Sequence, residues 1–246
     1  VEAGERVAIV GRSGTGKSTL LNIVGMLDRP TSGTYRVDGV DAVGLREGRR
    51  ARMRGASFGF VFQQFNIFAA RTAVENVEVP LLYEAGPGFW RRRRLATEML
   101  ERVGLGDRAD SYPSQMSGGE QQRIAIARAL VRKPKTILAD EPTGALDPHT
   151  GGAVMDLLES VAEENDAALI TITHDMAIAA RSHTVFELFD GVLHRLGSAA
   201  DFVGGSPQEP PPPPDDGPDG AGTSRTEAPG ARGDGADGRD WAEEQQ

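Results

Sequence analysis

The chain reads GRSGTGKST at residues 11–19. This stretch fits the P-loop (Walker A) pattern G-x-x-x-x-G-K-[S/T], in which backbone N–H groups surround phosphates, the lysine pairs with the β- and γ-phosphate oxygens and the hydroxyl holds Mg²⁺. An apolar, β-branched run precedes it at residues 6–10, and apolar residues at helical spacing follow it at residues 18–26. A strand, a glycine turn and a helix N-terminus form an anion site, because unpaired N–H groups and the positive end of the helix dipole meet there. The stretch therefore predicts that the chain binds a nucleoside triphosphate.

Every residue of this loop is a candidate for binding the nucleotide: Gly11, Arg12, Ser13, Gly14, Thr15, Gly16, Lys17, Ser18 and Thr19. The glycines allow the backbone to curl around an anion, because no side chain obstructs it. The competing interpretation is a glycine-rich turn with a chance lysine, and the flanking strand and helix argue against it.

The composition bounds the class of protein. The 246 residues, 39% of them hydrophobic, suffice for one sizeable core with or without a small second lobe. Of the 36 acidic and 27 basic residues, 11 and 3 lie in residues 198–246, so the remainder carries 25 and 24 and is close to neutral. This balance gives no indication of nucleic-acid binding. The absence of cysteine excludes disulfides and thiolate metal sites and is compatible with a reducing compartment.

The two ends of the chain read differently from its middle. Residues 198–246 contain an unbroken proline run at 210–214 and few large apolar residues, so we expect a disordered, acidic, Pro/Gly-rich tail. No apolar run approaches the roughly 20 residues of a membrane helix, and the charged first residues do not fit a secretory signal. Because the chain does not begin with Met and its phosphate loop comes early, we expect it to be part of a longer protein.

Two further predicted strands end in polar side chains. Residues 57–65 (SFGFVFQQF) read as a strand ending in two glutamines, which could also be plain loop-start residues. Residues 136–139 (TILA) read as a buried strand that ends at Asp140 and Glu141. Adjacent carboxylates there are costly without a cation, so we expect Asp140 to hold Mg²⁺, directly or through water, and Glu141 to polarise the attacking water as general base. The competing interpretation is an acidic pair that caps a helix.

A third predicted strand, residues 167–173, ends at His174. Active groups cluster at the carboxyl ends of parallel strands, so we expect a functional role for this histidine. The other three, His149, His183 and His194, are interpreted as surface or packing residues.

Residues 34–43 (TYRVDGVDAV) read as a short hairpin with Asp38-Gly39 at its bend.

Residues 72–132 read as helical, and a helix over residues 90–103 places Leu95, Met99, Leu100 and Val103 on one face. Ser117 and Glu120 are spaced as a capping box at the start of one helix, and Ser117-Gly118-Gly119 there also forms a second candidate anion site; the two interpretations are compatible. The run of arginines at residues 91–94 fits the solvated side of another helix, with contact to phospholipid head groups or to an acidic partner as the alternative.

Five motifs follow one another along the chain: the phosphate loop, MSGGEQQR at 116–123, ILADEP at 137–142, ALD at 145–147 and THD at 173–175. With these motifs, about residues 1–197 resemble the ATP-binding subunit of an ABC transporter. NIVGMLDRPTSG, FGFVFQQFN and LADEPTGALD are similar to the lipoprotein-releasing and macrolide-efflux group, which includes the cell-division ATPase. The resemblance implies an α/β P-loop NTPase fold, an ABC-type ATPase core with a helical subdomain at about residues 72–132.

The resemblance also implies a head-to-tail homodimer with two ATP molecules at its interface. Each ATP would lie between the phosphate loop of one subunit and Ser117, Gly118 and Gly119 of the other. Lys17 would grip phosphate, and Ser18, Gln63 and Asp140 would surround Mg²⁺. Glu141 would be the catalytic base, His174 the γ-phosphate sensor and Asp147 the link between the two sites. Integral-membrane permease subunits would bind the helical lobe and the Gln63 loop, so the chain would be cytoplasmic and peripheral on the inner face of the cell membrane.

Two departures from the family pattern stand out. Glu120 occupies the position of the usual glutamine in SGGQ, which fits the subgroup. Family members also begin earlier, with edge strands and an adenine-stacking aromatic residue that this chain lacks, so we expect an exposed sheet edge.

Two other functions are alternatives. A regulatory ATPase that signals through a non-transporting permease would carry the same residues. A DNA-repair or chromosome ATPase would need coiled-coil or zinc insertions between the two ATP motifs, and the sequence has neither.

Overall fold

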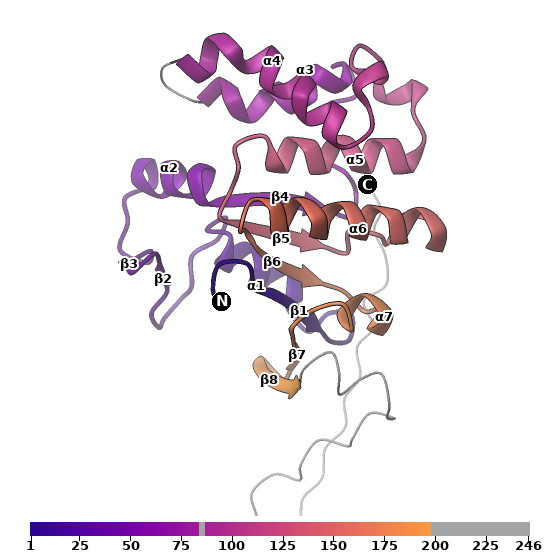
Figure 1. Ribbon diagram of the computed structural model, residues 1–246. Helices are drawn as coiled ribbons and strands as arrows, with labels where there is room; N and C mark the ends of the chain where they lie inside the picture. Colours follow the sequence, from indigo (N-terminus) through magenta and orange to yellow (C-terminus); the bar gives the residue numbers. More distant parts are fainter. Residues whose placement is uncertain (84–86, 198–246) are drawn as a thin grey trace, which may run out of the picture. The chain divides into compact units, whose positions relative to one another are not determined.

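A six-stranded sheet carries the fold (Figure 1). The computed structural model describes residues 1–83 and 87–197, so the predicted acidic tail lies outside the described residues. The strand order is β4-β5-β6-β1-β7-β8. The first five strands of that order are parallel to one another, and β8 pairs antiparallel with β7. Their bounds are β1 Arg6–Val10, β4 Phe58–Phe62, β5 Thr136–Asp140, β6 Ala168–Ile172, β7 Thr184–Phe189 and β8 Val192–Gly197.

Because β1, β4, β5 and β6 are parallel, their carboxyl ends lie at one edge of the sheet. The register puts Phe62 opposite Asp140, and Asp140 opposite Ile172. The segments that leave these strands at Gly11, Gln63 and Thr173 therefore begin at nearly the same level. The strand order, with β6 between β5 and β1, brings the loop after β1 next to the ends of the other two.

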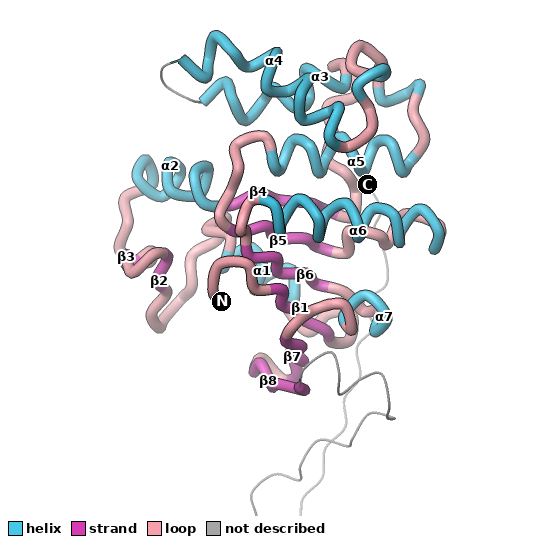
Figure 2. The backbone as a smooth tube through the Cα atoms, viewed as in Figure 1, coloured by secondary structure: helices cyan, strands magenta, loops and turns pink. Residues whose placement is uncertain are grey.

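The two faces of the sheet pack against different helices, because successive side chains of a strand point to opposite faces. Ile137 and Ala139 of β5 contact the cluster that contains α5 (Gly118–Leu130) and α6 (Pro148–Glu164). Leu138, between them, belongs to the cluster that contains α1 (Lys17–Val24). Figure 2 shows the strands between α1 on one side and α5 and α6 on the other.

Most of the predicted helical region, residues 72–132, forms a lobe stacked on α5, which is the last helix of that region (Figure 1). It comprises α3 (Ala73–Glu78), η1 (Val79–Tyr83), α4 (Pro87–Arg102), η2 (Gly106–Arg108) and η3 (Pro113–Gln115). Helix α4 turns Met99, Leu100 and Val103 into the same core as α5, with the periodicity expected from the sequence. Two of its arginines are paired with acidic side chains: Arg92 lies 3.4 Å from Glu78 and Arg93 2.8 Å from Asp110. This favours the solvated-helix interpretation of residues 91–94.

A small hairpin and one helix connect α1 to β4. Strands β2 (Arg36–Val37) and β3 (Val40–Asp41) meet at Asp38 and Gly39, whose φ angles of 49° and 75° allow the tight turn predicted from Asp-Gly. Helix α2 (Glu47–Ser57) follows, and its Arg54 donates to the Met26 carbonyl just beyond α1 at 2.8 Å.

The structure corrects two expectations. The strand predicted over residues 57–65 covers only Phe58–Phe62, because the chain then turns, with the Phe65 N–H donating to the Phe62 carbonyl at 3.2 Å. The chain after Asp190-Gly191 also forms β8, which the sequence reasoning did not predict. This edge strand and α7 (Met176–Ala179), which lies between β6 and β7 in the chain, complete the described elements.

Candidate functional site

The loop at residues 11–19 joins the end of β1 to α1, as predicted. Gly14 and Gly16 have φ of 82° and 95°, and a Cβ built at either position would have no neighbour within 4 Å. The backbone therefore turns in a conformation that favours glycine, beside open space. Lys17 Nζ donates to the carbonyls of Gly11 and Arg12, both at 2.8 Å. The ammonium lies over its own loop, at the place where the pattern puts phosphate oxygens.

Asp140, at the end of β5, lies against the start of α1. The Ser18 hydroxyl donates to its carboxylate, and Lys17 lies close enough to interact with it electrostatically. Burial raises the pKa of Asp140, and the neighbouring charge of Glu141 raises it further, while Ser18 and Lys17 oppose the shift. A divalent cation would offset the cost of ionising Asp140 beside Glu141. The Ser18 hydroxyl is a further oxygen ligand for such a cation.

The donor set fits Mg²⁺ in particular. Within residues 1–83 and 87–197, no cluster of three or more His, Cys, Asp or Glu side chains is placed to hold a metal. Magnesium usually takes only one or two protein carboxylates and completes its shell with water and substrate phosphates. The hydroxyl of Ser18 and the carboxylate of Asp140 meet that need beside a phosphate loop.

Glu141 lies next to His174. Its Oε1 is 2.8 Å from His174 Nδ1, and the hydroxyl of Thr173 donates to Oε2 at 3.4 Å. The Glu141 backbone has φ of 46°, a left-handed conformation that costs on the order of 1 kcal/mol in a residue with a side chain. Hydrogen bonding to Glu141 and the charge of that carboxylate raise the pKa of His174. The sequence reasoning named Glu141 and His174 but missed Thr173, which the strand end alone could have indicated.

Gln63, directly after β4, lies against the loop that follows β5. A Cβ added to Gly144 would meet Gln63 Nε2 at 2.8 Å, so the amide lies over that glycine. The same loop ends at Asp147, whose side chain caps α6 by accepting from the Thr150 N–H at 3.0 Å. Hydrogen bonding to Thr150 lowers the pKa of Asp147. Asp147 thus has a capping role here, and a link between two sites stays a prediction.

Ser117 forms the predicted capping box at the start of α5. Its Oγ accepts from the Glu120 N–H at 3.3 Å, and Glu120 Oε2 accepts from the Ser117 N–H at 2.8 Å. Hydrogen bonding to Ser117, from its backbone N–H first, lowers the pKa of Glu120. A hollow of about 460 Å³ opens beside this helix end, lined by residues of α4, α5 and α6 that include Ser117, Gly119 and His149.

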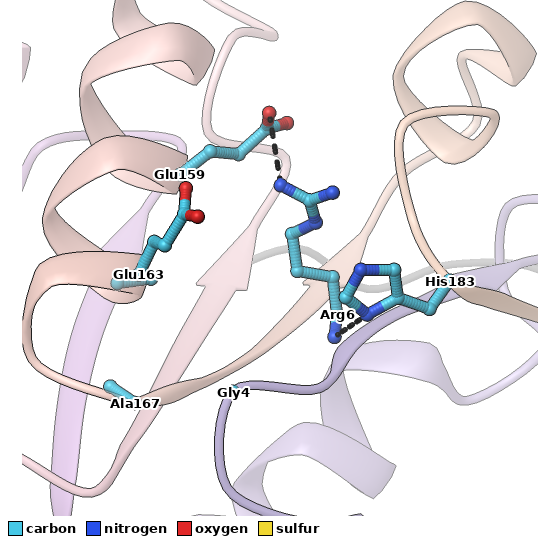
Figure 3. Close-up of a pocket in the computed structure, with 7 residues that line it drawn as sticks. Gly4, Arg6, Glu159, Glu163, Ala167 and His183 are labelled. Carbon is cyan, nitrogen blue, oxygen red and sulfur yellow. Dashed lines mark hydrogen bonds and ion pairs between the residues drawn. The ribbon is translucent and has the colours of Figure 1, made fainter.

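A second, smaller hollow of about 100 Å³ lies at the opposite end of the strands (Figure 3). Arg6, at the start of β1, donates its backbone N–H to His183 Nδ1 at 3.0 Å and directs its guanidinium toward Glu159, at 3.8 Å. These contacts join β1, α6 and the segment before β7, so His183 packs structurally, as expected. The hollow lies at the amino ends of the strands, away from Lys17 and Glu141.

The structure thus gathers Lys17, Ser18, Asp140, Glu141 and His174 at the carboxyl ends of three neighbouring strands, with Gln63 on a fourth. A phosphate loop, paired carboxylates and a histidine in this arrangement define a P-loop nucleotide hydrolase.

Comparisons with known proteins narrow this class. The sequence model described as "ABC transporter" matches residues 1–144. Among curated proteins, the chain is 52% identical over 188 residues to the macrolide export ATP-binding/permease protein MacB 1/2 of Paracoccus denitrificans, a match that covers 76% of this chain and 28% of that protein. It is 50% identical over 197 residues to MacB of Escherichia coli K12, covering 79% of this chain and 30% of that protein. The chain therefore spans less than a third of the length of these relatives.

Solved structures agree with these matches. The ATP-binding cassette MJ0796, in a dimeric post-hydrolysis state bound to ADP and phosphate, superposes with a TM-score of 0.72 at 43% identity, covering 79% of this chain and 85% of that one. A second dimeric structure of MJ0796 matches equally well, with 44% identity. The chain belongs to the ABC transporter family, and it has the fold of an ABC-type ATPase, as the sequence resemblance implied.

Proposed function

We propose that this cassette binds ATP with Mg²⁺ and hydrolyses it to drive a membrane permease of the macrolide-efflux type. The observation that carries the proposal is the convergence of Lys17, Asp140, Glu141 and His174 at one edge of the sheet. Lys17 would leave the carbonyls of Gly11 and Arg12 and pair with phosphate oxygens. Ser18 and Asp140 would hold Mg²⁺, which would neutralise charge on the phosphates, and Gln63 would complete that shell.

Glu141 is proposed as the general base, because its carboxylate lies at the site mouth and is oriented by two groups, Thr173 and His174. His174 is well exposed on its other side and would contact the terminal phosphate. Hydrolysis of this kind depends mainly on positioning and charge stabilisation. Loss of Lys17 or Glu141 should therefore lower the rate by orders of magnitude.

The exposed N-terminus of α5 supports a paired assembly. Ser117 and Gly119 line a hollow that no residue of the phosphate loop lines, and Gly118 and Gly119 carry the first N–H groups of α5, while the Ser117 N–H is bonded to Glu120. ATP bound to the phosphate loop of a second copy would place its phosphates at this helix end. The symmetric contact would form at the other copy, which gives two shared sites. The dimeric state named for MJ0796 fits this arrangement.

The proposal also includes a membrane permease as the partner of the cassette. The relatives are named as ATP-binding/permease proteins, and among the described residues no helix is long and apolar enough to cross a membrane. The cassette would bind permease subunits through its helical lobe and Gln63 loop, on the cytoplasmic face of the membrane. A regulatory role, in which the permease signals instead of transporting, uses the same site.

The decisive experiment is the solution mass of the Glu141→Gln variant of the whole chain by light scattering, with and without MgATP. We expect the 26.2 kDa chain to be a monomer alone and a dimer with MgATP. A chain that binds ATP tightly but stays monomeric at high concentration would contradict the shared-site assembly. ATP-dependent macrolide movement into vesicles, after reconstitution with the permease region, would separate transport from regulation.

A further inference from the structure

Helix α5 contacts the loop that carries Glu141 through a side chain near its N-terminus. Gln122 on this helix is fully buried, and its Nε2 donates to the Pro142 carbonyl at 2.6 Å. Pro142 directly follows Glu141. Gln122 lies one helical turn before Ile126 and two before Leu130, on a stripe that is otherwise apolar and buried. A polar side chain on this stripe is therefore placed for its contact with the loop.

The Glu141–Pro142 segment is held from both sides. The Glu141 N–H donates to the Ile172 carbonyl of β6 at 2.9 Å, and the Pro142 carbonyl accepts from Gln122. Between these two bonds the backbone of Glu141 adopts its left-handed conformation, with φ of 46°. A conformation of this kind persists only where the surroundings fix it. The Glu141 carbonyl also accepts from the Gly144 N–H at 3.0 Å, so the bond from Gln122 is one of three backbone contacts that hold this segment.

The amide of Gln122 is not needed for packing. Its Oε1 is buried without a hydrogen-bond partner, which is an energetic cost that an apolar side chain of similar shape would avoid. The group that the amide contributes is the N–H directed at Pro142.

The same helix also holds the other loop of the site. Arg128 donates to the carbonyls of Phe65 at 3.0 Å and Asn66 at 2.6 Å, just after Gln63. The two loops meet where Gln63 lies over Gly144. Helix α5 is therefore bonded to both strand-end loops, and Gln122 makes the contact nearer to Glu141.

We infer that Gln122 is a positioning residue for hydrolysis, which acts by fixing the Glu141–Pro142 backbone so that the Glu141 carboxylate points at the attacking water. The inference rests on the proposed role of Glu141. A misplacement of about 1 Å at a reacting group can lower a rate on the order of a hundredfold. Loss of the bond should therefore reduce kcat and leave ATP binding nearly unchanged, because the phosphate loop does not contact Gln122.

The test compares Gln122→Met with Gln121→Met in the whole chain. Methionine keeps the length of the side chain and removes the donor. Gln121 is a control on the same helix, since its Nε2 donates to the carbonyls of Pro113 and Met116, before Ser117, and not to the loop that carries Glu141. We expect Gln122→Met to lower kcat tenfold or more with KM for ATP within twofold, and Gln121→Met to lower kcat by a clearly smaller factor. Equal losses in both variants, or a kcat for Gln122→Met within twofold of the parent, would overturn the inference.

A second comparison shows whether Gln122 acts through Glu141. In the Glu141→Gln background, the residual rate should be the same with and without the Gln122→Met substitution, because the group being positioned is already gone. A further tenfold loss there would contradict action through Glu141. Should Glu141→Gln itself hydrolyse ATP at the parent rate, the proposed base would be wrong, which is distinct from failure of Gln122→Met alone. If Gln122→Met does not fold, Gln122→Asn, one methylene too short to reach Pro142, gives the same comparison.

Discussion

Glu141 and His174 face each other across the ends of two neighbouring strands, with Oε1 and Nδ1 2.8 Å apart. The pair joins the proposed base to the proposed phosphate sensor. The other side of the His174 ring stays exposed and available to a phosphate while Nδ1 contacts Glu141. The strength of this pair can be measured without nucleotide.

The pKa of His174 should fall when Glu141 is replaced. The Glu141 carboxylate favours the protonated ring, so the pKa is raised above its ordinary value of 6.5 in the folded protein. The stabilisation from the pair is then fully present below pH 6.5 and is lost as the pH rises through the raised pKa. NMR titration of the ring should give a lower pKa in Glu141→Gln than in the parent protein. An unchanged pKa in that variant would mean that the pair does not form in solution.

Asp140→Asn should stabilise the nucleotide-free protein while abolishing hydrolysis. The pKa of Asp140 is raised, so ionising it costs stability at every pH above that pKa, and the cost is absent below the unfolded value near 3.8. An amide removes this cost. We expect Tm at pH 7 to rise by less than the roughly 2–4 °C that about 1 kcal/mol produces in a domain of this size, because Asp140 is only half-buried and Ser18 and Lys17 offset part of the cost. The exposed Asp107→Asn serves as control and should leave Tm unchanged; a Tm for Asp140→Asn at or below the parent's would contradict the argument.

Local patterns in the sequence predicted most of this architecture. The Asp38-Gly39 turn, the capping box of Ser117 and Glu120 and the inward face of α4 depend on residues close in the chain, and each is present. The phosphate loop lies between strand and helix as expected.

Features that depend on distant contacts could not be predicted in this way. The segment after β4 is bonded to Arg128, far along the chain, which donates to the carbonyls of Phe65 and Asn66. The convergence of Asp140 and His174 depends on the order of the strands, which composition and periodicity do not specify. The family resemblance implied that the two residues act on one ATP, but it did not include the strand order. Gln122, whose partner is a backbone carbonyl on another element, carried no local signal beyond its polarity on an apolar stripe.

Gly25→Ala should destabilise the domain strongly. Gly25 ends α1 with an ordinary φ of −76°, so the backbone tolerates a side chain. The surrounding side chains leave no room for it, because a Cβ on Gly25 would lie 2.6 Å from Phe60 Cζ and 2.8 Å from Leu138 Cδ1. Overpacking of this kind costs about 1–3 kcal/mol. Gly48→Ala, in α2 with no neighbour within 4 Å of the added Cβ, should instead stabilise by up to about 1 kcal/mol. Urea unfolding should show a lower free energy of unfolding for Gly25→Ala and a higher one for Gly48→Ala. A Gly25→Ala protein as stable as the parent would show that α1 packs less closely against β4 and β5 than these distances indicate.

Two substitutions at Ser117 separate its capping role from its proposed role in binding phosphate. Alanine removes the cap of α5 and should cost about 1 kcal/mol, whereas aspartate is as good a cap as serine and should keep most of the stability. For phosphate binding we expect the opposite order, with alanine better than aspartate. Aspartate adds a negative charge at the helix N-terminus, whereas alanine leaves the backbone N–H groups free. In the Glu141→Gln background, Ser117→Asp should therefore have the higher Tm and the weaker MgATP-dependent dimer, as measured by light scattering. If dimerisation instead follows Tm across the two variants, Ser117 acts only as a cap, and the phosphates of the second copy lie elsewhere.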